Sequence, residues 1–337
     1  MDLTTKYMGV ELKNPIIVGA CNLVTDIKVL KTLEESGASA IVYKSLFEEQ
    51  IHLENLQHYQ AEEEYASRHA EMSGGMMPEM DHAGPEEYLG NLKKTREALD
   101  IPLFASLNAV YEETWVDYAK QIEATGVDGI ELNFYAIPKD FDIDGRSILT
   151  EQIDILQKVK ESINIPVAVK LSPYYTSILY AIGEMDKLDV DAFVIFNRLF
   201  QPEIDIDKEV HYFPYNLSSQ NDNRLTLRYA GLLHGNINAD ICCNHGIFTG
   251  EDVASMILAG ADTVQVVSTL YKNGLGQIKT MLQHLEDWMK SKNYKSLDEF
   301  RGKLSKKTLN DPFIYKRAQY VDILMNSDKI YKKYPLR

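Results

Sequence analysis

Two lysines and four asparagines each end a short, mostly apolar run in this sequence of 337 residues. Lys44 follows Ile-Val-Tyr and Lys170 follows Val-Ala-Val, and the asparagines are Asn108, Asn133, Asn197 and Asn244. A lysine at such a position is costly to bury unless a negative group meets its ammonium. Two of them beside several amides indicate a polar, planar ligand with delocalised negative charge, such as a reduced flavin. An ion pair of one lysine with Glu131 is the structural alternative.

Two segments late in the chain suit a phosphate group. In Gly246-Ile247 the glycine lets the backbone approach a ligand closely, and Ser268-Thr269 supplies hydroxyls and amides where a helix is expected to begin. Parallel barrels often bind phosphate after their last two strands. These segments therefore predict where the phosphate of flavin mononucleotide (FMN) would bind.

A phrase that occurs four times predicts the elements that position these residues. Its copies cover residues 36–42, 125–130, 188–194 and 259–264, and three of them contain a glycine before the apolar run. That glycine suits the left-handed position that ends a helix, and the apolar run suits a strand covered on both faces. Strands of a second kind alternate with these copies, at residues 14–18, 101–105, 165–170 and 239–243, and the first three of them are introduced by proline.

Together these runs predict eight strands, which begin near residues 15, 39, 102, 128, 166, 191, 238 and 262. Apolar residues at three- and four-residue steps predict helices over residues 26–35, 85–99, 114–124, 147–162, 176–188, 224–233, 251–258 and 270–290. Eight alternating βα units predict an α/β protein with a closed (β/α)8 TIM barrel, whose strand ends meet at one mouth. A doubly wound open sheet is the alternative, but no G-x-G-x-x-G segment follows the first strand.

We expect one FMN-binding domain over residues 1–337, with the core barrel at about 14–292. An N-terminal β-hairpin precedes it, and a tail of short helices follows over 293–337. Long loops after the second and sixth strands, residues 45–84 and 197–223, are typical of lids or binding loops. A dimer contact or a plain surface excursion is the alternative for both.

Composition and charge exclude several classes of function. The net charge of −15 argues against a nucleic-acid partner, because the first Lys/Arg-rich block comes only at residues 303–307. The three cysteines and eight histidines have no metal-ligand spacing, so we predict neither disulfides nor a metal site. The N-terminus lacks the pattern of a signal peptide, and no apolar run approaches the ~20 residues of a membrane span. We therefore expect a cytoplasmic protein without a membrane partner.

The order and spacing of several motifs resemble the class 1 dihydroorotate dehydrogenases and the related domain of dihydropyrimidine dehydrogenase. The resemblance covers almost the whole chain. Its motifs are Asn-Pro-Ile at 14–16, Lys-Ser at 44–45, Ile-Glu-Leu-Asn at 130–133, Val-Lys-Leu-Ser-Pro at 169–173, Asn197 and residues 249–265. It implies a (β/α)8 barrel that binds FMN, forms a homodimer and transfers hydride.

The resemblance also implies roles for individual residues. It implies FMN contacts at Ala20, Lys44, Ser45, Asn108, Asn133, Lys170, Gly246, Ile247, Ser268 and Thr269. Cys21 adjoins the expected flavin edge, with a space-filling buried thiol as the alternative, and Asn244 belongs to the same group of amides. Lys44, Asn133 and Asn197 would also face the substrate.

The chain departs from the family where a catalytic base is expected. In the family, the loop after Asn133 carries a Cys or Ser that removes a proton from the substrate carbon. Here residues 133–138 read Asn-Phe-Tyr-Ala-Ile-Pro, so Ala136 stands at the base position and its methyl group cannot accept a proton. Tyr135 is the candidate acid or base on this loop, with aromatic packing as the alternative.

Other departures also lie on the substrate side. Arg198 follows Asn197 and could pair with a substrate carboxylate, or with a glutamate of the long loop. His245 replaces part of a glycine-rich turn, where it suits a hydrogen-bonded residue near the phosphate. We infer that the flavin site is kept and the substrate site is rebuilt.

The sequence thus predicts an FMN-dependent oxidoreductase that moves hydride between a CH–CH substrate and flavin N5. Dihydroorotate, an intermediate of pyrimidine biosynthesis with a carboxylate, is the best single substrate by resemblance. One alternative is a flavoprotein that passes electrons to a partner or serves as a non-catalytic subunit. Another is a phosphate-binding barrel lyase or isomerase without flavin.

Overall fold

The computed structural model describes residues 1–48, 85–109, 112–134, 141–198, 202–212, 217–311, 313–316, 318–326, 328 and 332. Eight parallel strands form its centre: β3 (Ile16–Val18), β4 (Ala40–Val42), β6 (Leu103–Asn108), β7 (Gly129–Phe134), β8 (Val167–Leu171), β9 (Ala192–Ile195), β12 (Asp240–Asn244) and β13 (Thr263–Val266). Each strand pairs with the next around the circle, and the pairing of β4 with β6 closes it. The predicted (β/α)8 barrel is confirmed, because an open sheet would leave two edges unpaired.

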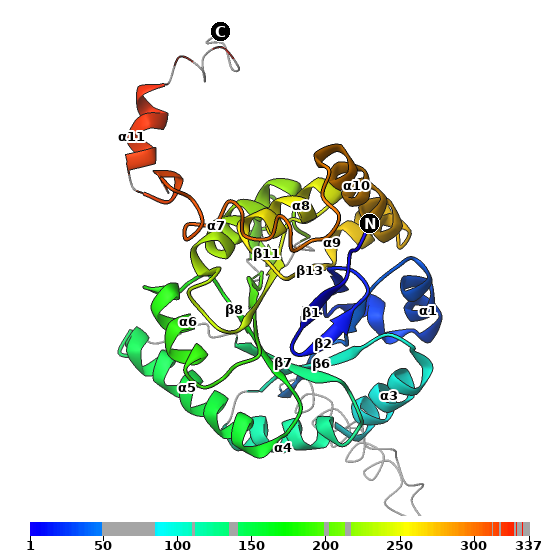
Figure 1. Ribbon diagram of the computed structural model, residues 1–337. Helices are drawn as coiled ribbons and strands as arrows, with labels where there is room; N and C mark the ends of the chain where they lie inside the picture. The colour runs from blue at the N-terminus through cyan, green and yellow to red at the C-terminus, as the bar shows by residue number, and fades with distance from the viewer. Residues whose placement is uncertain are drawn as a thin grey trace, which may run out of the picture.

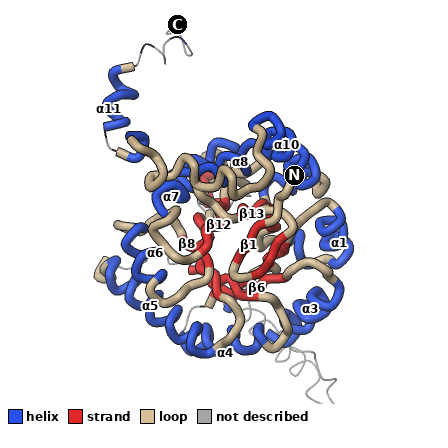
Figure 2. Tube along the Cα trace, in the orientation of Figure 1, coloured by secondary structure: helices blue, strands red, loops and turns tan. Residues whose placement is uncertain are grey.

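Helices surround the strands as an outer ring (Figures 1 and 2). They are α1 (Ile27–Glu35), α3 (Pro85–Ala98), α4 (Glu112–Glu123), α5 (Gly145–Ser162), α6 (Ile178–Asp186), α7 (Arg224–Leu233), α8 (Gly250–Ala259), α9 (Ser268–Asn273) and α10 (Gln277–Lys292). The prediction of one helix over 270–290 is wrong, because the helix is interrupted between α9 and α10. Gly274 has a φ of 83° there, a left-handed conformation that ends α9.

The predicted N-terminal hairpin, β1 (Thr5–Tyr7) and β2 (Val10–Leu12), closes the amino end of the barrel. Tyr7 and Met8 are buried, and they pack with inward-facing residues of the strands, among them Phe104 and Val194. The backbone amide of Met8 donates to Asp240 Oδ2 at 2.8 Å. The amino half of the barrel is therefore a filled apolar core, and it leaves only the carboxyl end for a ligand.

The repeated phrase has a structural role at the same amino end. Three of its aspartates accept a hydrogen bond from a backbone amide at the start of the neighbouring strand. Asp128 accepts from Leu103, Asp191 from Val167 and Asp262 from Ile241, each at 2.8 Å. In the remaining copy, Ser39 Oγ donates to the carbonyl oxygen of Ile16 at 2.7 Å. The repeat thus joins strands in pairs around the barrel.

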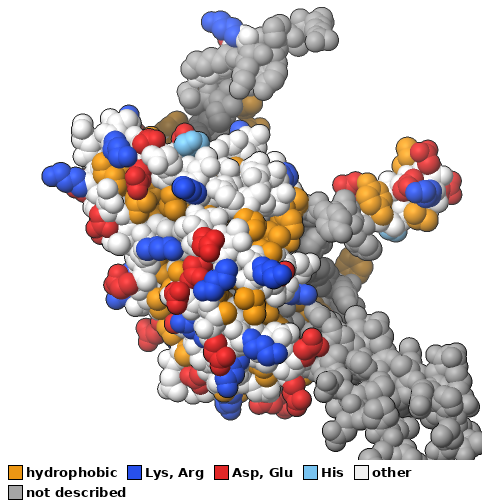
Figure 3. All heavy atoms as spheres, turned by 90° about the vertical axis from the view of Figure 1, so that its right-hand side faces the viewer, with side chains coloured by type: hydrophobic (Ala, Val, Ile, Leu, Met, Phe, Trp, Pro, Cys, Tyr) orange, Lys and Arg blue, Asp and Glu red, His pale blue; other side chains and the backbone are white. Residues whose placement is uncertain are grey.

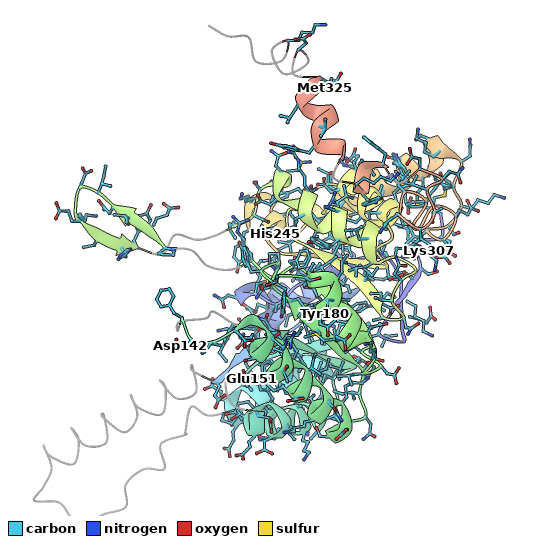
Figure 4. The ribbon with its side chains drawn as sticks, turned by 90° about the vertical axis from the view of Figure 1, so that its left-hand side faces the viewer. Asp142, Glu151, Tyr180, His245, Lys307 and Met325 are labelled. Atoms are coloured by element: carbon cyan, nitrogen blue, oxygen red, sulfur yellow. The ribbon has the colours of Figure 1, made fainter. Side chains whose placement is uncertain are left out.

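Some elements were not predicted. β5 (Leu46–Phe47) pairs with β6, and the 197–223 segment contains a hairpin of β10 (Glu203–Asp205) and β11 (Val210–Tyr212) followed by η2 (Gln220–Asn223). The hairpin projects away from the barrel (Figure 4). Residues 49–84, most of the other predicted long loop, lie outside the described residues.

Short helical elements occupy the tail as predicted, at η3 (Phe313–Tyr315) and α11 (Ala318–Met325). α11 lies away from the ring of barrel helices (Figure 1). On one outer face of the molecule, lysine and arginine side chains are interspersed with aspartate and glutamate (Figure 3). Across the described ranges, no helix is long and apolar enough to cross a membrane.

We expect Asp128→Ala to lower the free energy of unfolding by about 1–3 kcal/mol, because it leaves the buried Leu103 amide without its side-chain acceptor and removes the Arg96 ion pair at 3.4 Å. Urea unfolding followed by circular dichroism measures this loss. Asp154→Ala, at an exposed position on α5, is the control and should change stability by less than about 0.5 kcal/mol. Equal effects of the two substitutions would contradict the role of the repeat.

A second prediction concerns pH. Burial, reinforced by Asp262, raises the pKa of Asp240 from 3.8 to about 6. A carboxyl whose pKa is raised on folding favours the folded state while protonated, so its contribution falls as pH rises from about 4 through 6. Asp240→Asn keeps an oxygen for the Met8 amide but does not titrate. Its stability relative to the unsubstituted protein should therefore rise by about 2 kcal/mol between pH 4 and pH 7 in urea unfolding. A difference that does not change with pH would refute this assignment.

Candidate active site

Polar side chains fill the barrel interior towards the carboxyl ends of the strands. Successive residues of a strand point to opposite faces, so residues two positions beyond an inward apolar side chain also point inward. On β6, Phe104 is followed in this way by Ser106 and Asn108. Six inward side chains are at most 6% exposed, and they are Ser106, Asn108, Glu131, Asn133, Lys170 and Gln265. So many polar groups in a barrel core indicate a binding site, because apolar residues would fill it at lower cost.

Lys170 on β8 lies at the centre of this layer. Its ammonium is 3.1 Å from Glu131 Oε1 on β7 and 3.4 Å from Gln265 Oε1 on β13. The other oxygen of Glu131 accepts a hydrogen bond from Gln265 Nε2 at 2.6 Å. The structural alternative of an ion pair with Glu131 is thus confirmed for Lys170. Lys170 is also the register partner of Asn133 on β7, so it lies at the level where a ligand at the carboxyl end would bind.

Lys44, the second predicted lysine, follows β4 and is half-buried. Its carbonyl oxygen accepts a hydrogen bond from the Tyr88 hydroxyl at 2.8 Å, which fixes the backbone. Within the described ranges its ammonium has no hydrogen-bond or ion-pair partner. The neighbouring Ser45 hydroxyl shares a hydrogen bond of 2.7 Å with that of Ser106. As far as the described residues go, Lys44 is therefore a cation at the mouth that is available to an anionic ligand.

Three asparagines from different strands extend the polar layer. Asn197, just after β9, donates from Nδ2 to Asn133 Oδ1 at 2.9 Å, so two predicted substrate contacts lie side by side. Asn108 Nδ2, at the end of β6, is buried and has no hydrogen-bond partner in the described part of the chain. A buried amide hydrogen without an acceptor is costly unless a ligand supplies one. The carbonyl and ring nitrogen acceptors of a flavin fit this requirement, as its anionic reduced form fits the two lysines.

Arg198 lies next to the amides but is already occupied. Its Nη1 donates to Asp222 Oδ2 at 2.6 Å and contacts His245 Nε2 at 2.9 Å. Burial, and then the Arg198 charge, lowers the pKa of His245, so this imidazole is neutral and accepts the contact. The carboxylate in this ion pair comes from η2, and the acidic residues 62–64 of the other long loop lie outside the described residues. In Figure 4, His245 lies on the side of the molecule from which the hairpin extends.

The residues predicted for the phosphate converge on Ser218, which sequence analysis missed. The Gly246 amide donates to Ser218 Oγ at 3.3 Å, and the Ser218 amide donates to Ser268 Oγ at 2.9 Å. Lys272, also missed, donates to the Ser218 carbonyl oxygen at 2.8 Å. Its position four residues after Ser268 on the same helix was the available signal, whereas nothing local marks Ser218.

Glycine at 246 has a clear cause in the fold. A Cβ there would come within 2.5 Å of the backbone nitrogen of Asn223, and φ is +70°. The close approach that this glycine permits is therefore to the backbone around η2. Two neighbouring predicted contacts are also enclosed: Ile247 is 3% exposed, and the fully buried Thr269 hydroxyl accepts from Asn273 at 3.0 Å.

The remaining predicted contacts lie at the rim. Ala20 and Cys21 follow β3 and are half-buried, and burial raises the pKa of the Cys21 thiol, which keeps it protonated. Asn244 Oδ1 accepts from the His245 amide at 2.8 Å, so it shapes the turn after β12. Tyr135 and Ala136 lie outside the described residues. Among the residues the structure describes, no group of three His, Cys, Asp or Glu side chains could hold a metal ion.

Known proteins share this sequence over most of its length. A family model described as dihydroorotate dehydrogenase matches residues 2–289. The catalytic subunits of dihydroorotate dehydrogenase B (NAD(+)) from Thermoplasma volcanium and Methanocaldococcus jannaschii are each 27% identical, and the alignments cover 89% of this chain and 98% and 97% of those proteins. Dihydropyrimidine dehydrogenase (NADP(+)) from Arabidopsis thaliana is 25% identical over 89% of this chain and 76% of its own length. With its closed barrel and polar carboxyl end, this chain belongs to the dihydroorotate dehydrogenase family.

Proposed function

We propose that this protein is an FMN-dependent oxidoreductase that oxidises dihydroorotate to orotate in pyrimidine biosynthesis. The observation that carries the proposal is the polar layer at the carboxyl end, where Lys44 and Asn108 Nδ2 lack partners among the described residues. A planar ligand that accepts hydrogen bonds and gains negative charge satisfies both. Family membership and the names of the relatives support dihydroorotate as the substrate.

FMN would be held by residues from seven strand ends. These are Ala20, Cys21, Lys44, Ser45, Asn108, Asn133, Lys170, Asn244, Gly246, Ile247, Ser268 and Thr269. When bound, it supplies the acceptor for the hydride that leaves the substrate carbon. Lys170 would stabilise the negative charge that reduction places on the ring, because its ammonium is fixed in a water-poor core.

The substrate would lie above this layer, held at its carboxylate by Lys44. Asn133 and Asn197 would orient it, since the hydrogen bond from Asn197 Nδ2 to Asn133 Oδ1 fixes both amides. Arg198 already pairs with Asp222 through Nη1, so we assign it a supporting role at the edge of the site.

The proton lost with the hydride needs an acceptor that Ala136 cannot provide. We assign this step to Tyr135, which carries the nearest ionisable group in the loop sequence. A tyrosine accepts a proton only as phenolate, so a nearby cation must lower its pKa from about 10. This assignment predicts slower substrate oxidation at neutral pH than a cysteine base would give.

Ala136 at the base position also favours a second function. A protein without the usual base could receive or deliver electrons through a partner protein, as the relatives named as catalytic subunits suggest. Rapid flavin reduction by a partner reductase, with no reduction by dihydroorotate, would favour this second function. We also propose that the chain is a single-domain homodimer of the cytoplasm, which light scattering and cell fractionation test.

The substrate assignment is tested by mixing the FMN-loaded protein anaerobically with L-dihydroorotate. We expect the flavin absorption to bleach in a single phase, because hydride transfer reduces the ring. In the Tyr135→Phe variant, bleaching should slow by about 10²–10⁴-fold while FMN remains bound. Absence of bleaching over hours in the unsubstituted protein would rule out dihydroorotate.

The role of Lys44 predicts a separate effect on substrate binding. Lys44→Ala should raise the dihydroorotate concentration needed for half-maximal bleaching rate by roughly 10–100-fold, the effect of losing a charge-assisted hydrogen bond worth about 1.5–3 kcal/mol. Lys94→Ala, at an exposed position on α3, is the matched control and should leave this concentration unchanged. An unchanged value in Lys44→Ala would remove this lysine from the substrate site.

A further inference from the structure

Glu131 is a buried charge that the proposed reaction does not use. It is 1% exposed, and neither FMN nor substrate is assigned to it. Its two oxygens have different partners, Lys170 at 3.1 Å and Gln265 at 2.6 Å. The inward-facing Tyr7 and Cys242 are nearby, and burial raises the pKa of both groups, so they stay neutral. Glu131 is thus the negative charge that balances Lys170 inside the barrel.

The hydrogen bond from Gln265 gives this pair a defined direction. It holds one carboxylate oxygen of Glu131 on the β13 side, so the other oxygen meets Lys170 from the amino-end side. Glu131 lies two residues before Asn133 on β7, and Asn133 is the register partner of Lys170. The lysine stem is buried, which leaves the ammonium few alternative positions. Contacts with Glu131 and with Gln265 Oε1 at 3.4 Å use two of its three N–H donors, which leaves one for a ligand. Asn108 Nδ2 also lacks a partner within the described chain.

A lysine that is paired with a carboxylate and a lysine that is unpaired would act differently on a ligand that gains negative charge. An unpaired buried ammonium attracts a developing anion strongly in a low-dielectric core. An adjacent carboxylate offsets part of that attraction and at the same time keeps the lysine protonated. The extent of this offset sets how readily a bound flavin accepts electrons.

We propose that Glu131 is a positioning residue that holds the Lys170 ammonium towards the flavin and, by offsetting its charge, lowers the reduction potential of bound FMN. This inference rests on the proposed function, because it requires FMN above Lys170. Gln265 assists by fixing the carboxylate of Glu131. Since a lower potential makes the reduced flavin a stronger donor, the device favours passage of electrons onward from the protein.

The test is the midpoint potential of the FMN-loaded protein, measured by anaerobic titration with a reference dye. Glu131→Gln removes the negative charge with little change of shape. It should shift the two-electron equilibrium towards reduced flavin by at least about tenfold, or about 30 mV. Asp191→Asn is the matched control, because Asp191 also pairs with a lysine, Lys160 at 2.8 Å, but at the amino end of the barrel. It should shift the equilibrium less than twofold, and an equally small shift in Glu131→Gln would overturn the proposal.

A second set of variants separates positioning from a direct field. Without Lys170, a buried carboxylate takes up a proton and becomes neutral, so Lys170→Met and Lys170→Met/Glu131→Gln should have the same potential within about twofold. If the midpoint potentials of Lys170→Met and the double variant differ by as much as Glu131→Gln alone shifts the potential, Glu131 acts without the lysine, against the proposal. If Glu131→Gln does not fold, Glu131→Asp replaces it, because it withdraws the carboxylate by one methylene. Glu131→Asp should shift the two-electron equilibrium towards reduced flavin by at least about threefold. An unchanged equilibrium would again overturn the inference.

The same preparation distinguishes failure of the inference from failure of the proposed function. Protein that takes up no FMN refutes the function, and the inference with it. Protein that binds FMN and is bleached by dihydroorotate, but has one potential in all the variants, refutes the inference alone.

Discussion

The ion pair between Lys170 and Glu131 constrains the whole carboxyl half of this barrel. Neither charge is stable alone in the interior, and each is held by a different strand, with Gln265 contributing a third. Three strands must therefore keep their register for the pair to form, and a closed barrel provides that register. The cost of burying the pair is acceptable where it serves a ligand, since an apolar core of equal volume would be at least as stable.

The amino end of the barrel stabilises the fold, and the carboxyl end carries the candidate site. At the amino end, the hairpin seals an apolar core and the aspartates of the repeat join neighbouring strands through backbone amides. That arrangement fixes the strand positions from below. Polar side chains can then occupy the upper layer, where Asn108 Nδ2 has no hydrogen-bond partner among the described residues and is available to a ligand. A rigid base thus supports a polar site.

Most of the fold could be predicted because its signals are local. The glycine and aspartate of the repeat mark where a helix ends and a strand begins, and the eight predicted strands match the observed barrel strands. The break at Gly274 was missed because apolar spacing continues across it, although Asn273-Gly274 is a turn signal in the sequence. The hairpin of β10 and β11 was missed because its strands are three residues each and lack a periodic pattern long enough to detect.

The site was predicted less completely, for a physical reason. Strand ends converge by topology, so the lysines and asparagines could be placed from sequence. Ser218 meets Gly246 and Ser268 only because η2 folds back over the turn after β12, and no local signal encodes that contact. The Asp222 partner of Arg198 was likewise not predicted, since it reaches the arginine through the same tertiary approach. Residues on long loops need the fold before their partners are known.

If the polar layer at the carboxyl end is a flavin site, an equilibrium titration with FMN will show it. Quenching of flavin fluorescence measures the uptake by the unsubstituted protein and by the Asn108→Leu and Lys170→Met variants. We expect one FMN bound per chain, and weaker binding in Asn108→Leu, because the Asn108 amide has no partner among the described residues. No uptake of FMN, or equal affinity in all three proteins, would show that the layer is not a flavin site.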